Sequence, residues 1–232
     1  GKWSQEYFEH YGARKIFYSP HCVDNEYFSR EADKFTTDRS RLKSAWGIPE
    51  NSFVFLFAGK FEPKKRPMDL LAAVKQLTQK KSLNEKFHVL MAGDGLLKKE
   101  CECFAAAESP PVSFTGFLNQ SQMPKAYAVS DALVLPSDFR ETWGLVVNEA
   151  MACGLPAIVS DQTGCGPDLI KEGGTGFIYR CGDVQSLSDK MIELMRRKRE
   201  TNMKQNVRSH IARYSVDEAA QGILEAVEGS VR

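Results

Sequence analysis

The chain has 232 residues and carries 31 lysines and arginines against 30 aspartates and glutamates, a formal net charge of +1. A charge this close to neutral leaves no basic footprint for nucleic acid, and an ordinary apolar content of 42% argues against disorder. The length suits one sizeable α/β domain or two small ones, and the sequence contains no run of about 18 apolar residues that would predict a transmembrane helix.

The cysteines and histidines predict no metal site. Six cysteines lie at positions 22, 101, 103, 153, 165 and 181, none in the C-x2-C pairs typical of zinc sites, and the four histidines are scattered. Free thiols are typical of a reducing cytoplasm, so we expect a cytoplasmic location. Because the chain begins at Gly1, without Met or an apolar leader, we also expect it to be excised from a longer protein.

Two features of the first third of the chain predict the start of an α/β domain. Residues 36–46 have the composition of a helix, which the glycine and proline that follow would end. The apolar run at 52–58 is rich in aromatic and β-branched residues, so it favours a buried strand of a parallel sheet over a helix. Pro67 then stands where a helix can begin, and an apolar stripe follows along one face.

The alternation of strand and helix then continues along the chain. The later apolar runs that we expect to be strands lie at 87–92, 112–115, 132–136, 156–160 and 176–179. Helical patterns lie at 96–107 and 121–129, and a short one follows the glycine at 144. Strands that alternate with helices at this spacing predict βαβ units. The predicted fold class is therefore α/β, with a Rossmann-like parallel sheet, right-handed crossovers and helices on both faces.

From residue 183 onward the pattern is helical only. Asp183 has the side chain of an N-cap, an amphipathic helix follows it, and two more helices are expected around 201–213 and 216–228. No linker divides the chain convincingly. We therefore expect a Rossmann-like domain at 31–182, with the helices of 183–232 packed on the same domain.

One polar stretch carries two carboxylates at a fixed spacing. It follows the predicted strand at 132–136, turns at Gly144 and becomes a short helix; Glu141 lies in its loop and Glu149 in its helix. Apolar neighbours surround Glu149, so its charge must be paired or hydrogen-bonded. The N–H groups near Gly144 and Leu145 would form an anion site. The pattern indicates a ligand with hydroxyls and phosphate. An exposed loop acid and a helix acid favoured by the dipole are equally good explanations from the residues alone.

Another loop leaves the carboxyl end of a predicted strand, where ligands of open α/β sheets bind. Gly59 lets a backbone approach closely, and Lys60 and Lys65 could hold the two phosphates of a diphosphate. A solvent-exposed basic loop is the alternative. Gly93 opens a second tight turn, which lacks the third glycine of a dinucleotide fingerprint.

The run E-T-W-G-L-V-V-N-E-A-M-A-C-G-L-P, from Glu141 to Pro156, resembles the signature of the group 1 family of retaining glycosyltransferases. The similarity extends from about Lys15 to Tyr179. Members of that family have the two-domain GT-B fold and take a sugar from a nucleotide-diphosphate donor. The resemblance implies that this chain is the C-terminal, donor-binding domain of such an enzyme. Residues 1–30 would then be the interdomain crossover segment, with the apolar run at 15–20 as the last strand before it enters the domain.

The resemblance also implies roles for the candidate residues. Glu141 would accept hydrogen bonds from hydroxyls of the donor sugar, and Glu149 from those of the ribose. Lys60 and Lys65 stand where the family has basic residues on the diphosphate. The family more often has arginine at the first of these places, and lysine keeps the charge but loses the bidentate geometry.

The remaining candidates would act largely through their backbone. By resemblance, the N–H groups of Gly144, Leu145 and Val146 would meet the phosphates, and Gly93 would form the turn beside them. Phe117 would lie at the nucleobase, unless it simply belongs to the core.

Residues 160–168 resemble the Gly-Gly-x-x-Glu loop of the family, but this match is incomplete. Cys165 interrupts the glycines and Asp168 replaces the acid, so we assign the loop no catalytic role.

The sequence therefore predicts the donor-binding domain of a retaining glycosyltransferase of the hexosyltransferase type, without metal or other cofactor. The acceptor, a glycan, lipid or other molecule, would bind to a domain outside this chain, and only that domain would contact a membrane. The chain alone would transfer little sugar. Two alternatives stay open. One is a GT-B-like sugar-nucleotide enzyme, such as an epimerase or a phosphorylase with pyridoxal phosphate. The other is a non-catalytic nucleotide-binding or interaction module.

Overall fold

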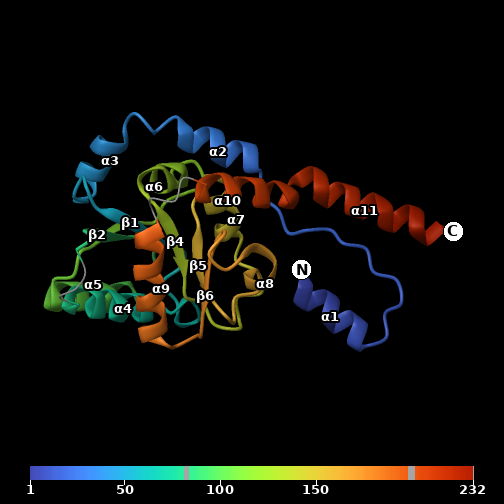
Figure 1. Cartoon of the computed structure of the whole chain (residues 1–232), viewed down its shortest axis with the longest axis horizontal. Coiled ribbons are helices and arrows are strands. Elements are labelled where there is room, and N and C mark those ends of the chain that lie inside the picture. Colours follow the sequence, from blue (N-terminus) through green and yellow to red (C-terminus); the bar gives the residue numbers. More distant parts are fainter. Residues whose placement is uncertain (81–83, 198–201, 232) are drawn as a thin grey trace.

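The computed structural model of the chain describes residues 1–80, 84–197 and 202–231 (Figure 1). The described strands form one sheet in the order β3-β2-β1-β4-β5-β6, and neighbouring strands pair in parallel. They are β1 (Phe53–Ala58), β2 (Phe87–Ala92), β3 (Val112–Gly116), β4 (Ala132–Leu135), β5 (Ala157–Ser160) and β6 (Gly176–Tyr179). This is the order of a doubly wound, Rossmann-like sheet, so the predicted fold class is confirmed.

Helices cover both faces of the sheet (Figure 1). Helices α4, α5 and α9 pack together on one face, while α2, α3, α6, α7 and α10 pack together on the other. The described helices, in chain order, are α1 (Lys2–His10), α2 (Asn25–Asp33), α3 (Arg39–Ala45), η1 (Pro63–Lys65), α4 (Pro67–Gln79), α5 (Lys98–Glu108), α6 (Met123–Val129), α7 (Leu145–Ala152), α8 (Gly166–Leu169), α9 (Val184–Arg196), α10 (Met203–Ile211), η3 (Ala212–Tyr214) and α11 (Val216–Val231).

The core lies between the sheet and its two helical layers. Every residue of β1 and β2 is buried, because helices cover both faces. This is why β1 is a continuous apolar run and β2 is apolar except at His88. The apolar stripe of α4 is buried against the sheet as expected; it consists of Leu70, Leu71, Val74 and Leu77. A sheet buried in this way gives the loops at its carboxyl edge a rigid base.

The apolar run at 15–20 is not a strand, contrary to the expectation. Residues 13–24 have no helix or strand and run beside α11, where Oγ of Ser19 donates to the carbonyl oxygen of Ala219 at 2.9 Å. The backbone of Tyr18 comes so close to α11 that a Cβ at Gly222 would lie 2.0 Å from its oxygen. A strand needs a neighbouring strand, and the partner of this segment within the described chain is a helix.

The helices near the two ends agree only in part with the prediction. Helices α1 and α2 were not predicted, and α3 begins at Arg39 rather than at 36. Helices α10 and α11 correspond to the two expected after 200, although residue 201 lies outside the described residues. Asp183 is the N-cap of α9 as predicted, since it accepts from the N–H of Ser186 at 2.9 Å.

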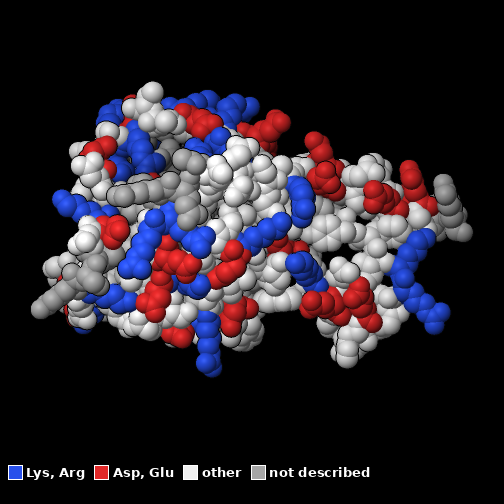
Figure 2. All heavy atoms as spheres, in the orientation of Figure 1, with Lys and Arg blue, Asp and Glu red and all other residues white. Residues whose placement is uncertain are grey.

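The described surface has no strongly charged face in the view of Figure 2. Lysines and arginines alternate with aspartates and glutamates over this side of the molecule. Among the helices that the structure describes, none is both long and apolar enough to cross a bilayer.

Candidate functional site

The loops at the carboxyl ends of β1, β2, β3 and β4 surround a cleft of about 1020 Å³. Strand order reverses between β1 and β4, and open α/β sheets bind ligands at this switch point. The cleft is large enough for a nucleotide-sized molecule. Every residue that the sequence singled out for binding or catalysis lines it: Gly59, Lys60, Lys65, Gly93, Phe117, Glu141, Gly144, Leu145, Val146 and Glu149.

Lys65 and Glu141 form an ion pair inside the cleft. Nζ of the lysine donates to Oε2 of the glutamate, and the two side chains are only 14% and 13% exposed. The hydroxyl of Ser137 donates to the same carboxylate oxygen at 3.2 Å. Glu141 is therefore not a freely exposed loop acid. A lysine ammonium has three hydrogens, so Lys65 can hold Glu141 and still donate to an anion.

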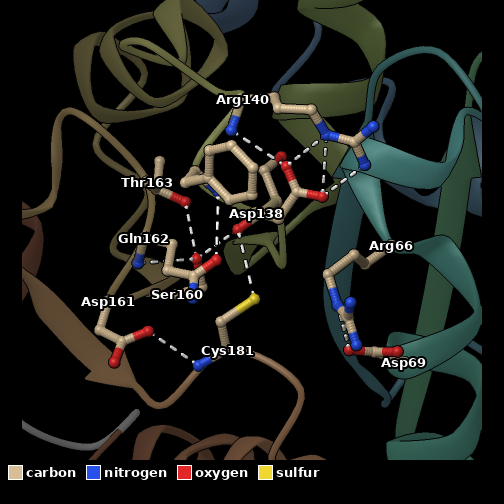
Figure 3. A network of polar contacts seen from close by, with 11 residues as sticks. Arg66, Asp69, Asp138, Arg140, Ser160, Asp161, Gln162, Thr163 and Cys181 are labelled. Atoms are coloured by element: carbon tan, nitrogen blue, oxygen red, sulfur yellow. Dashed lines mark hydrogen bonds and ion pairs between the residues drawn. The ribbon is translucent and has the colours of Figure 1, made fainter.

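The loop that carries Glu141 is fixed by a network of polar contacts (Figure 3). Oγ of Ser160, at the end of β5, donates to the carbonyl oxygen of Ser137. The carboxylate of Asp138 accepts from Arg140 at 2.6 Å, and this hydrogen bond lowers the pKa of Asp138. Arg140 thus forms an ion pair with Asp138 and is not among the described residues that line the cleft. The loop is held in place before any ligand arrives, which reduces the entropy cost of binding.

The neighbouring loop after β5 supports the same loop from the other side. The N–H of Gly164 donates to the carbonyl oxygen of Glu141 at 3.0 Å, and a Cβ at Gly164 would lie 1.9 Å from the oxygen of Thr142. Only glycine permits this approach. Asp168 is buried and accepts from the N–H of Lys2 at 3.0 Å, and it is not among the described cleft residues. Asp168, which replaces the glutamate of the family's Gly-Gly-x-x-Glu loop, therefore makes contacts within the protein and does not face the cleft.

Glu149 has the hydrogen-bonded environment that its apolar neighbours required. Its Oε2 accepts from the hydroxyl of Tyr127 on α6 at 2.5 Å, and the tyrosine is almost completely buried. Burial raises the pKa of Glu149, while the hydrogen bond from Tyr127 lowers it. The sequence did not single out Tyr127, because this contact joins two helices and an amphipathic pattern around a tyrosine predicts only a core position.

The start of α7 presents backbone donors to the cleft. Gly144 has φ +103° and a Cβ there would lie 2.8 Å from Leu135, so the turn requires glycine. The N–H of Val147 donates to the carbonyl oxygen of Gly144 at 2.8 Å. Leu145 and Val146 are the first residues of the helix and line the cleft, and N–H groups in a first turn have no acceptor within their own helix. Such groups attract anions.

The opposite wall consists of two closely packed glycine turns. Gly93 has φ +144°, and a Cβ there would lie 1.9 Å from the carbonyl oxygen of Gly59. The N–H of Gly59 donates to the carbonyl oxygen of Ala92 at 3.0 Å, so the first turn is held by β2. The absence of side chains at both glycines brings backbone to the surface of the cleft.

Lys60 and Phe117 are the exposed members of the set. The side chain of Lys60 is 78% exposed, and Nζ lies 3.9 Å from the carboxylate of Glu62. Phe117 is 73% exposed just beyond the end of β3, so the alternative that it belongs to the core is wrong. His21, to which the sequence assigned no chemistry, also lines the cleft. Within the described residues, no three or more His, Cys, Asp or Glu side chains are grouped to hold a metal ion.

The comparison with protein families decides the membership of this chain. The family described as "Glycosyl transferases group 1" matches residues 38–228. The chain belongs to the group 1 glycosyltransferases.

The relatives of this glycosyltransferase chain are longer than the chain itself. Sulfoquinovosyl transferase SQD2 of Arabidopsis thaliana is 34% identical over 176 residues, which cover 75% of this chain and 32% of that protein. N-acetyl-alpha-D-glucosaminyl L-malate synthase of Bacillus anthracis is 30% identical over 173 residues, covering 73% of this chain and 43% of that protein.

A solved structure shows the same fold. Anabaena Alr3699/HepE in complex with UDP matches 99% of this chain and 62% of that chain, with a TM-score of 0.80 and 24% identity. The chain thus spans 32% to 62% of the length of these three proteins, and it has the Rossmann-like fold of GT-B glycosyltransferases.

Proposed function

We propose that this chain is the donor-binding domain of a retaining glycosyltransferase. It binds a nucleotide-diphosphate sugar in the cleft, and the sugar passes to a glycan, lipid or other acceptor. One observation carries the proposal: a single cleft contains the Lys65–Glu141 pair, the first-turn N–H groups of α7 and the carboxylate of Glu149. These groups match a sugar, a diphosphate and a ribose. Because the structural neighbour HepE was solved with UDP, UDP is the first nucleotide to test.

The diphosphate would lie between Lys65 and the start of α7. During transfer, the bond between the anomeric carbon and the phosphate oxygen breaks, and negative charge develops on the departing nucleoside diphosphate. Lys65 and the N–H groups of Leu145 and Val146 would stabilise that charge, as fixed donors do at developing anions. Lys60 would add a more exposed positive charge at the mouth of the cleft. Protein cations and backbone donors thus perform the role, and the proposal includes no cofactor.

The sugar and the nucleoside would extend from the diphosphate in opposite directions. Glu141 would accept hydrogen bonds from hydroxyls of the sugar, and Glu149 from the ribose. Phe117, exposed beyond β3, would lie near the nucleobase. In a retaining transfer the acceptor oxygen bonds to the face of the anomeric carbon from which the diphosphate leaves, and the proton of the acceptor hydroxyl passes to the departing diphosphate. Retention is proposed from the resemblance of the Glu141–Glu149 stretch to the family signature.

The proposed organisation places acceptor binding outside this chain. Residues 1–30 would form the interdomain crossover, 31–182 the nucleotide-sugar-binding domain, and 183–232 the helices packed on it. Helix α2 spans the first proposed boundary and packs on α6 and α7, so the end of the proposed crossover segment contacts the donor domain. The proposed location is the cytoplasm, with any contact to the inner face of a membrane made by the acceptor domain.

Calorimetric titration of the chain with UDP, GDP, ADP and their common sugar conjugates tests the proposal. We expect saturable binding of one nucleotide, equal in Mg²⁺ and in EDTA, because the phosphate donors are protein groups. The corresponding monophosphate should bind more weakly, since it lacks the second phosphate. Failure of every nucleotide to bind at millimolar concentration, or binding only with Mg²⁺, would contradict the proposed site.

A further inference from the structure

Asn148 is a buried polar side chain with hydrogen bonds at both ends. It has no exposed surface, its Oδ1 accepts from Nε1 of Trp143 at 2.8 Å, and its Nδ2 donates to the carbonyl oxygen of His21 at 3.0 Å. An indole N–H only donates and a carbonyl only accepts, so one orientation of the amide satisfies both partners. These residues form the Trp143–Asn148–His21 bridge, in which Asn148 and His21 are 127 positions apart in the chain.

One arm of the bridge, the hydrogen bond from Trp143 to Asn148, holds the loop that contains the proposed anion site. Trp143 directly precedes Gly144, and Asn148 directly precedes Glu149 on α7. The bond from the indole to the amide therefore fixes the turn against the first turns of the helix. The carbonyl oxygen of Trp143 also accepts from the N–H of Cys165 at 3.0 Å, which ties the same point to the loop after β5. The position of the first-turn N–H groups of α7, where the diphosphate is proposed to bind, depends on this arm.

The other arm, the hydrogen bond from Asn148 to the carbonyl oxygen of His21, holds segment 20–24, through which the chain enters the domain. The ring of His21 lies 4.5 Å from the ring of Trp143, centroid to centroid, on the wall of the cleft. Partial desolvation lowers the pKa of His21, so the ring is uncharged near neutral pH and packs on the indole without burying a charge. Asp24 accepts from the N–H of Tyr27 at 2.8 Å and begins α2, which packs on α7. A shift of segment 20–24 must break the bridge or move the loop.

We propose that Asn148 is a positioning residue that makes segment 20–24 and loop 141–146 move as one unit. The inference rests on the proposed function in one respect, that the loop geometry matters because the loop binds the donor. Asn148 acts through Trp143, which sets the turn at Gly144. A displacement of the chain before α2 is thereby transmitted to the donor phosphates, and the segment that enters the domain controls the affinity of the site.

The half-buried thiol of Cys22, next to His21, reports on the segment without any ligand. Its alkylation rate is measured by mass spectrometry in the wild-type chain and in two variants. Asn148→Leu removes both arms, whereas Trp143→Phe removes only the loop arm and keeps the bond to His21. We expect both variants to raise the rate at Cys22 by about tenfold, because an unsatisfied buried polar group destabilises the packing of segment 20–24 against the loop. Both should also weaken nucleotide diphosphate binding by about tenfold.

Val147→Ala is the matched control, because it removes buried methyl groups from the same helix and leaves the bridge intact. Its Cys22 rate and nucleotide affinity should stay near those of the wild type. A wild-type Cys22 rate in Trp143→Phe would overturn the coupling, and this variant decides the question even if Asn148→Leu does not fold. Faster alkylation without loss of affinity would overturn the positioning role. A wild-type chain that binds no nucleotide would contradict the proposed function, while the Cys22 rates still decide the coupling.

Discussion

Replacing Lys65 by methionine is expected to weaken the binding of a nucleoside diphosphate by about 10- to 150-fold. This range corresponds to the loss of one hydrogen bond to a charged group, about 1.5–3 kcal/mol. The variant also leaves Glu141 as an uncompensated negative charge, 13% exposed, beside the expected phosphates. Calorimetric titration of the chain measures both the affinity and the enthalpy of the lost contact.

Two further variants separate lost binding from lost folding. Lys60→Met removes a charge that is 78% exposed, so solvent and salt screen it and the affinity should fall by less than about fivefold. Lys65→Met combined with Glu141→Gln removes both charges of the pair, so the thermal stability should return towards that of the wild type while the diphosphate affinity stays low. Equal losses for Lys60→Met and Lys65→Met would show that neither lysine has a specific place in the site.

Replacing Tyr127 by phenylalanine is expected to make nucleotide binding more sensitive to falling pH. The hydroxyl of Tyr127 donates to the carboxylate of Glu149 and lowers its pKa, against the burial that raises it from the usual value of 4.5. Without the hydroxyl only burial remains, so the pKa of Glu149 rises further. Below that pKa the protonated carboxyl accepts more weakly from ribose hydroxyls, so the affinity falls with falling pH and recovers once the carboxylate forms again.

A titration series from about pH 5 to about pH 9 measures this effect. The variant should lose about tenfold in affinity at the acidic end relative to wild type, and much less at the basic end. Tyr179→Phe is the matched control, because Tyr179 is equally buried and its hydroxyl has no hydrogen-bond partner among the described residues. Glu149→Gln should bind weakly at every pH. Parallel profiles for wild type and Tyr127→Phe would mean that Glu149 does not bind the ligand as a carboxylate.

The sheet could be predicted because its local signals agree with its final environment. Strand β1 is apolar at every position and buried on both faces, and Pro67 begins α4 where the sequence placed a helix. The run at 15–20 contains three consecutive apolar residues, Ile16, Phe17 and Tyr18, but lies beside α11 instead of another strand. Composition reports that a segment is apolar. It does not report which element will lie beside the segment, and the segment forms a strand only if its neighbour is another strand.

The residues of the cleft could be predicted because they lie in the loops and helices that follow strands, and the carboxyl ends of parallel strands meet at one edge. Their partners could not. Tyr127 reaches Glu149 from another helix, and Asn148 reaches His21 across most of the chain. One signal was available for Asn148: like Glu149, it is a polar side chain surrounded by apolar residues in α7, and such a group requires hydrogen-bond partners when buried.

A crystal structure of the chain with the nucleotide that binds most tightly tests the central claim most directly. The account predicts the diphosphate in the cleft, with phosphate oxygens about 2.7–2.9 Å from Nζ of Lys65 and close to the N–H groups of Leu145 and Val146. The ribose hydroxyls should donate to Glu149. A nucleotide bound outside the cleft, or a diphosphate remote from both Lys65 and the start of α7, would contradict the proposed donor site.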